Sequence, residues 1–227
     1  MQFLKSSVGR KILMALTGLL MVLFVVAHMV GNSLLYFGYD TFNAYAAGLQ
    51  RLIPLLWSFR LLLLTVFLAH VVLGIQITLE NRAAQPVAYA VKQTVCSTFE
   101  SRNMIWTGLL VGGFIVFHLL HFTMHVIYPN LSSAVFKDAA GRPDVYRMVL
   151  LNFARPNITF VYVLAMAALF LHLSHGVQSL FQTLGQTGWK NSEKTFALVK
   201  KGGYLAALAI FAGFVLLPVV IYLGVVR

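Results

Sequence analysis

The residues best suited to chemistry in this sequence are its histidines, because all seven lie in long apolar stretches and none lies in a polar connection. They are His28, His70, His118, His121, His125, His172 and His175. An ionisable residue inside a membrane is costly and usually functional, and neutral imidazole is a common metal ligand. The distribution therefore predicts a metal-containing cofactor held between membrane-spanning helices.

Composition indicates which elements must position these histidines. The chain has 227 residues, of which 59% are hydrophobic and 10% charged, whereas soluble domains average about 25% charged residues. Five apolar stretches reach the roughly 20 residues that a spanning helix needs: 12–37, 57–79, 104–128, 157–181 and 203–225. The connections are too short for a soluble domain, so we predict an all-α membrane protein with one domain over residues 1–227. The first stretch is longer than the apolar region of a signal peptide.

Basic residues flank the apolar stretches and give the chain a formal net charge of +11. Basic residues beside membrane spans indicate contact with anionic lipid rather than with nucleic acid. With the N-terminus in the cytoplasm, ten Lys and Arg lie on the inner side and seven on the outer side. Because short cytoplasmic connections carry more basic residues, we predict a cytoplasmic N-terminus and an outer C-terminus.

Depth along the predicted helices divides four of the histidines into two levels. At about 1.5 Å per residue, His28 and His118 lie about 25 Å from the inner boundary, and His70 and His172 about 18–20 Å. This favours pairing His28 with His118 and His70 with His172. Two imidazoles from facing helices can fill both axial positions of a haem iron. A single histidine inside a span is more simply explained by a hydrogen bond between helices. Four histidines in separate spans instead favour two b-type haems.

The remaining histidines have two possible roles. His121, His125 and His175 either form hydrogen bonds to protein or haem propionates, or handle quinone and protons. His121 competes with His118 as a ligand, and His175 competes with His172.

Other kinds of centre are excluded within this chain. Cys96 is the lone cysteine, so neither a disulfide nor an iron–sulfur cluster can form, and covalent haem attachment lacks its Cys-x-x-Cys-His motif. None of the six acidic residues lies in the middle of a predicted span. The carboxylate proton relay found in many pumps and transporters is therefore missing, which favours electron transfer.

Taken together, these residues resemble a known family, the single-chain, five-helix, two-haem cytochrome b subunit of succinate:quinone oxidoreductase. The resemblance covers nearly the whole chain. It depends on short segments around the histidines: Lys11, Thr17-Gly18, His28, Gly31-Asn32, Asn43-x-Tyr45, His70, Thr107-Gly108, His118, and His172-Leu-Ser-His175-Gly176 with Ser179 and Phe181. It implies that His28, His70, His118 and His172 are the axial ligands of two haem b groups. It also implies partner subunits that carry a flavin and iron–sulfur clusters.

The predicted function is therefore that of a dihaem membrane anchor in a succinate dehydrogenase or fumarate reductase. We expect it in the inner membrane of a bacterium, where it passes electrons between a cytoplasmic iron–sulfur subunit and quinone, with menaquinone as the expected type. The chain alone is not expected to convert a dicarboxylate. The alternatives are a haem b anchor of a hydrogenase or formate dehydrogenase, and a haem-free channel or transporter.

The predicted quinone site lies at the outer end of the bundle. Such a site needs an apolar pocket with a few convergent polar groups. Asn32 comes after His28 in the sequence, and His121 and His125 come after His118, so all three are expected nearer the outer surface than these two ligands. Ser7, Arg10 and Lys11 form a competing inner set. The inner face, with the 80–102 and 182–202 connections, is expected to dock the iron–sulfur subunit.

Overall fold

A computed structural model describes residues 6–84, 98–185 and 192–227, and five of its helices are long and apolar enough to cross a membrane. The described part of the chain is helical, with only an isolated bridge between Lys137 and Pro143 in place of a sheet. This confirms the predicted helical class and the five spans. Lys5, Lys92, Cys96 and Lys190, on which parts of the charge and cysteine arguments rest, lie outside the described residues.

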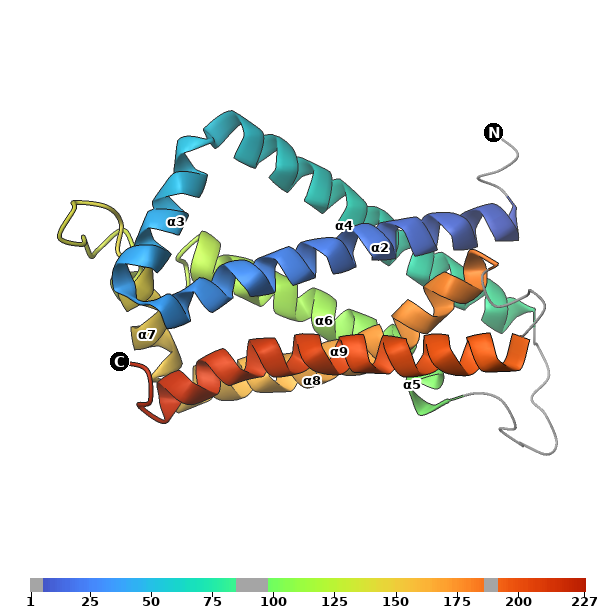
Figure 1. Cartoon of the computed structure of the whole chain (residues 1–227). Coiled ribbons are helices and arrows are strands. Elements are labelled where there is room, and N and C mark those ends of the chain that lie inside the picture. The colour runs from blue at the N-terminus through green and yellow to red at the C-terminus, as the bar shows by residue number, and fades with distance from the viewer. Residues whose placement is uncertain (1–5, 85–97, 186–191) are drawn as a thin grey trace.

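The long helices lie side by side in one bundle (Figure 1). They are α2 (Ser7–Ser33), α4 (Ile53–Ala83), α6 (Met104–His118), α8 (Pro156–Thr183) and α9 (Ser192–Tyr222). We call the end that carries the start of α2 the inner end and the opposite end the outer end, after the predicted orientation, which itself stays a prediction. The described residues also contain three shorter helices: α3 (Tyr39–Arg51), α5 (Phe99–Arg102) and α7 (Val145–Phe153). The short turn η1 (Leu34–Phe37) lies between α2 and α3, and η3 (Pro129–Leu131) precedes α7.

Several element bounds differ from the sequence prediction. The last span begins as α9 at Ser192, not at 203, so most of the predicted 182–202 connection is helix. The connection predicted as loop at 130–156 contains α7, which Asp144 caps by accepting a hydrogen bond from the backbone N–H of Arg147. The third span stops short of 128: α6 gives way at His118 to a π-helical turn, η2 (Leu119–Thr123).

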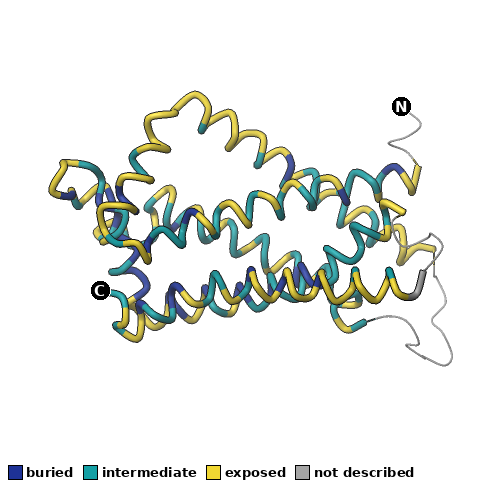
Figure 2. The backbone as a smooth tube through the Cα atoms, viewed as in Figure 1, coloured by how far each residue is buried: buried dark blue, intermediate teal, exposed yellow. Residues whose placement is uncertain are grey.

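The core lies mainly at the outer end, where α3, α7, α8 and α9 meet. Its buried members include Leu35, Phe42, Phe153, Tyr162 and Leu217. By contrast, nearly every residue of the first third of α4 is exposed, where that helix leans away from the bundle (Figure 2). Exposed apolar side chains of this kind are expected on a surface that faces lipid.

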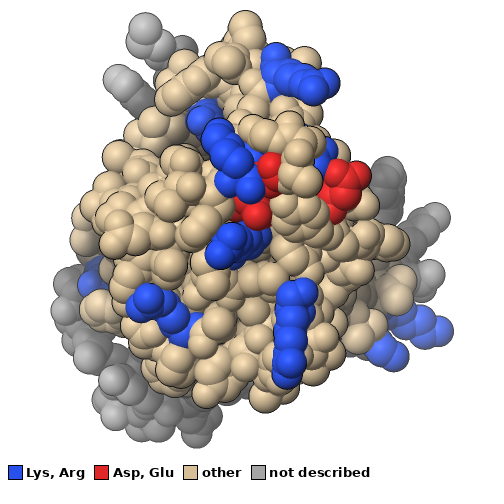
Figure 3. All heavy atoms as spheres, turned by 90° about the vertical axis from the view of Figure 1, so that its left-hand side faces the viewer, with Lys and Arg blue, Asp and Glu red and all other residues tan. Residues whose placement is uncertain are grey.

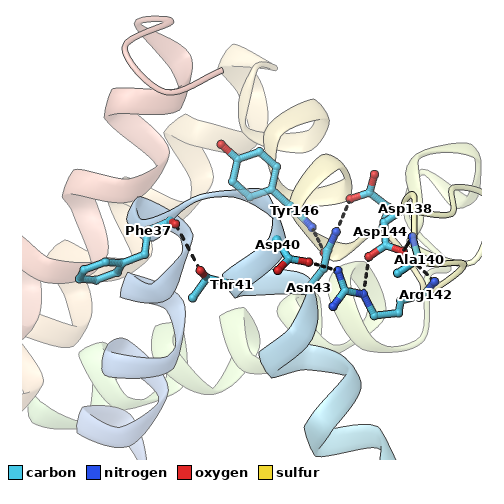
Figure 4. Close-up of polar contacts among 9 residues, drawn as sticks. All are labelled: Phe37, Asp40, Thr41, Asn43, Asp138, Ala140, Arg142, Asp144 and Tyr146. Carbon is cyan, nitrogen blue, oxygen red and sulfur yellow. Dashed lines mark hydrogen bonds and ion pairs between the residues drawn. The ribbon is translucent and has the colours of Figure 1, made fainter.

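A polar clamp joins α3 to the chain before and within α7 (Figure 4). The Asn43 side chain is fully buried; it donates to Asp144 Oδ1 at 3.0 Å and accepts from the Tyr146 backbone N–H at 2.9 Å. Beside it, the Arg142 guanidinium contacts the carboxylates of Asp40 and Asp138. Burial opposes ionisation of Asp138, but its hydrogen bonds with Arg142 outweigh burial and lower its pKa. The contact between Arg142 and Asp138 therefore stabilises the fold fully above the ordinary carboxyl pKa. Its contribution is lost as the pH falls through the lowered pKa of Asp138.

We expect Asn43→Ala to destabilise the protein by about 2–4 kcal/mol, because it removes the hydrogen bond from Asn43 to the buried Asp144 carboxylate and leaves the Tyr146 backbone N–H without its partner. Unfolding in detergent, followed by circular dichroism, measures the change. Thr41→Ala is the matched control, since Thr41 is exposed on the same helix and should change stability by no more than about 0.5 kcal/mol. Equal stability of the two variants would show that the clamp contributes nothing.

Basic side chains occur at the outer end as well as the inner end. Figure 3 shows Lys and Arg scattered over the outer end, with the acidic side chains gathered in one area among them. The inner end has the ion pair between Arg10 and Glu80, 2.9 Å apart, which joins α2 to α4. Because both ends are basic, the charge distribution gives only the modest orientation bias that the sequence predicts.

Candidate functional site

Four of the histidines form two facing pairs inside the bundle. His28 of α2 and His118, the last residue of α6, have ring centroids 5.8 Å apart and ring planes at 79°. His70 of α4 and His172 of α8 have centroids 6.3 Å apart and planes at 69°. These are the two pairs that the depth argument favoured.

The separation within each pair suits two ligands on opposite sides of one metal atom. With metal–nitrogen bonds of about 2.0–2.1 Å, as imidazole makes to zinc, two trans imidazoles have their centroids about 6 Å apart. The described residues contain no group of three or more His, Cys, Asp or Glu that could hold a metal ion. Each facing pair could supply two imidazole ligands to one metal atom, the number that a haem with two axial histidines takes.

Threonine hydroxyls fix the rings of the inner pair. Thr17 Oγ1 lies 3.0 Å from His70 Nδ1, and Thr107 Oγ1 lies 3.3 Å from His172 Nδ1. Each hydroxyl donates its one proton to a backbone carbonyl in the preceding turn, so it can only accept from the imidazole. Each ring therefore carries its proton on Nδ1 and leaves Nε2 free to bind a metal.

Glycines let the inner imidazoles lie close to the neighbouring backbone. A Cβ atom added to Gly18 would lie 3.3 Å from His70 Cε1, and one added to Gly108 would lie 3.1 Å from His172 Cε1. These separations are tighter than ordinary contacts between carbon atoms, which are about 3.5–4.0 Å. A larger residue at either position would displace the ring.

The same pattern, Thr-Gly followed by histidine after nine residues, occurs in α2 and in α6. Thr17 precedes His28 by eleven residues, and Thr107 precedes His118 by eleven. Eleven residues are about three helical turns, so each threonine and histidine share a face about 16 Å apart along the axis. Each of these two helices thus supports the inner pair and supplies one member of the outer pair. The repeat was visible in the sequence, but the threonine contacts were not predicted.

His121 belongs to a different environment from His118. Its Nδ1 lies 3.0 Å from the Tyr162 hydroxyl and its Nε2 lies 2.8 Å from Asn152 Oδ1. The same hydroxyl lies 3.2 Å from His118 Nδ1. Both nitrogens of His121 are therefore occupied by protein, which leaves His118 as the histidine that faces His28. The sequence does not reveal Tyr162 and Asn152 as partners of His121, because they belong to α8 and α7, far from His121 along the chain.

His125 lies beyond the helical part of the third span, although the sequence predicts a single span over 104–128. It follows the π-helical turn with φ of +54°, a left-handed conformation that non-glycine residues rarely adopt. Its Nε2 is buried and has no hydrogen-bond partner among the described residues. The histidine pattern of the third span therefore divides into one residue of a facing pair, one hydrogen-bonded residue and one residue with a buried, unpaired nitrogen.

The other predicted quinone residues lie apart from these contacts. Asn32 is half-buried on α2, and no hydrogen bond in the described part of the chain joins it to His121 or His125. In the inner set, Arg10 contacts Glu80, while Ser7 and Lys11 are exposed.

The inner end also holds a cavity that the sequence does not predict. Its volume is about 460 Å³, and its lining includes Glu100, Ser174, Gln178, Lys200 and Tyr204 from α5, α8 and α9. Hydrogen bonds from its own backbone N–H and from the Thr98 hydroxyl lower the pKa of Glu100, and nearby His175 adds to this. His175 is thus in electrostatic range of a carboxylate at the inner end, whereas His172 faces His70.

In comparisons with known proteins, no family model, curated protein or solved structure matches this chain.

Proposed function

We propose that this chain is the dihaem cytochrome b anchor of a succinate:quinone oxidoreductase or quinol:fumarate reductase. The observation that carries the proposal is the two facing histidine pairs, His28 with His118 and His70 with His172. The family resemblance of the sequence supplies the rest: the dicarboxylate, the flavoprotein and the iron–sulfur partner are inferred from it. Each pair would hold a haem b, which would supply one-electron redox chemistry.

The residues of the chain hold and orient the ligands of these haems. Thr17 and Thr107 keep the inner imidazoles in the tautomer that binds a metal, and Gly18 and Gly108 leave room for the rings. The two levels lie about three helical turns apart, so haems held by the two pairs would give electrons a route through the bundle between the inner end and quinone.

Quinone is proposed to bind at the outer end, where His125 is the leading contact. Its buried, unpaired Nε2 can exchange a hydrogen bond or a proton with a quinone oxygen near neutral pH. His121 is a weaker candidate because protein groups occupy both of its ring nitrogens. Asn32 remains a second proposed contact, and the set of Ser7, Arg10 and Lys11 remains the inner alternative.

Purification of the chain with its native partners tests this function. A copurifying flavoprotein and iron–sulfur protein, with dicarboxylate oxidation or reduction linked to quinone, is the expected result. A nickel or molybdenum subunit would instead identify the anchor of a hydrogenase or formate dehydrogenase, and a colourless chain would indicate a channel or transporter.

The quinone assignment is tested in the same assembly with His125→Leu. We expect quinone-linked activity to fall at least tenfold while both haems and the activity with a soluble electron acceptor remain. His175→Leu is the matched control at the opposite end. Unchanged quinone kinetics in His125→Leu would move the site to the inner set.

A further inference from the structure

Four polar side chains form an unbroken line from α7 to the outer histidine pair. Asn152 Oδ1 lies 2.8 Å from His121 Nε2, the Tyr162 hydroxyl lies 3.0 Å from His121 Nδ1, and it lies 3.2 Å from His118 Nδ1. Asn152, His121 and Tyr162 are only 2%, 2% and 7% exposed. No bulk water competes for these hydrogen bonds, so each proton position constrains the next.

The direction of every hydrogen bond in this line follows from Asn152. Its Nδ2 donates to the Met148 carbonyl at 2.8 Å and faces the Leu131 carbonyl at 3.4 Å, which fixes Oδ1 as the atom that faces His121. An amide oxygen only accepts, so His121 carries its proton on Nε2 and its Nδ1 is an acceptor.

The rest of the line is then determined. Tyr162 has one hydroxyl proton, and it donates that proton to His121 Nδ1. The hydroxyl oxygen therefore accepts from His118, which must carry its proton on Nδ1. The lone pair of His118 is left on Nε2, the nitrogen that a metal between His118 and His28 requires.

We propose that Asn152, His121 and Tyr162 are positioning residues that hold His118 in its metal-binding tautomer and tune its strength as a ligand. This inference rests on the proposed function, because it assumes a haem between His28 and His118. An acceptor on the far nitrogen of a ligating histidine fixes the ring and raises its basicity. A more basic ligand stabilises the oxidised iron, so the line should lower the reduction potential of the outer haem.

The test is a redox titration of the purified assembly with its haems bound, followed by optical spectroscopy. Tyr162→Phe keeps the ring among its aromatic neighbours and removes only the hydroxyl. We expect this variant to shift the equilibrium of the outer haem toward the reduced form by about tenfold. That corresponds to an increase of about 59 mV in the reduction potential of a one-electron couple. The reduction potential of the inner haem should not change. Asn152→Leu should shift the outer haem in the same direction by less.

A double substitution separates the proposed line from general structural damage. If Asn152 acts through Tyr162, Asn152→Leu adds no further shift once Tyr162→Phe is present, whereas independent effects would add. Tyr128→Phe is the matched control: this ring lies 6.2 Å from that of His121, but its hydroxyl accepts from Asn157. It should leave both potentials unchanged.

Three results would overturn the inference: no shift in Tyr162→Phe, an equal shift in Tyr128→Phe, or additive shifts in the double variant. If Asn152→Leu fails to assemble, the comparison of Tyr162→Phe with Tyr128→Phe decides the question alone. A wild-type assembly without an outer haem would instead overturn the proposed function, so the two failures are distinguishable.

Discussion

Replacing His118 with leucine is expected to remove one haem and to leave the other in place. The same component should disappear in His28→Leu, because the two rings face each other 5.8 Å apart and would share one iron. His70→Leu and His172→Leu should both remove the second component instead. Optical spectra of the purified variants, with the haem content of each, measure the result.

The control for these ligand substitutions is His175→Leu. His175 lies on α8 with His172, one turn further toward the inner end, and it should be replaceable with both haems retained. Loss of the same spectral component from His28→Leu and His70→Leu would contradict the pairing.

Gly108→Ala is expected to weaken the inner haem site although it changes no ligand. The added methyl group would lie 3.1 Å from His172 Cε1, so the ring must shift by a few tenths of an ångström, which disturbs its contact with Thr107 and its position opposite His70. Disturbing a group that orients a metal ligand typically costs about 10–100-fold in metal affinity. Haem titration of the apoprotein, resolved into the two components, measures the loss.

Gly113→Ala is the matched control on the same helix. An added Cβ there meets nothing within 4 Å, so both sites should bind haem as in the wild type. Full inner-site occupancy in Gly108→Ala, with wild-type affinity, would show that the glycine has no role in seating His172.

The sequence predicted the bundle well because its strongest signal, long apolar stretches, is also the physical requirement for spanning a membrane. The grouping of the histidines followed from counting residues to the helix ends, since helical rise is regular. The bounds were less certain where polar residues continue a helix: α9 includes Lys194, Lys200 and Lys201 before its apolar part begins.

The parts of the site that the sequence did not reveal depend on contacts between distant elements. His121 faces Tyr162 and Asn152 because the chain enters a π-helical turn after His118. The apolar pattern of the sequence predicts a regular helix at this point. The helix α7 was missed because turn residues precede it, and what secures it is the buried contact of Asn43 with Asp144. Neither contact follows from the local pattern of residues.

The most direct test of the account is the number of haems bound by the wild-type chain. A pyridine haemochrome assay on the purified protein, with the chain quantified by amino-acid analysis, should give two non-covalent b-type haems per chain. One haem or none per chain would contradict the proposal that both histidine pairs are axial ligands.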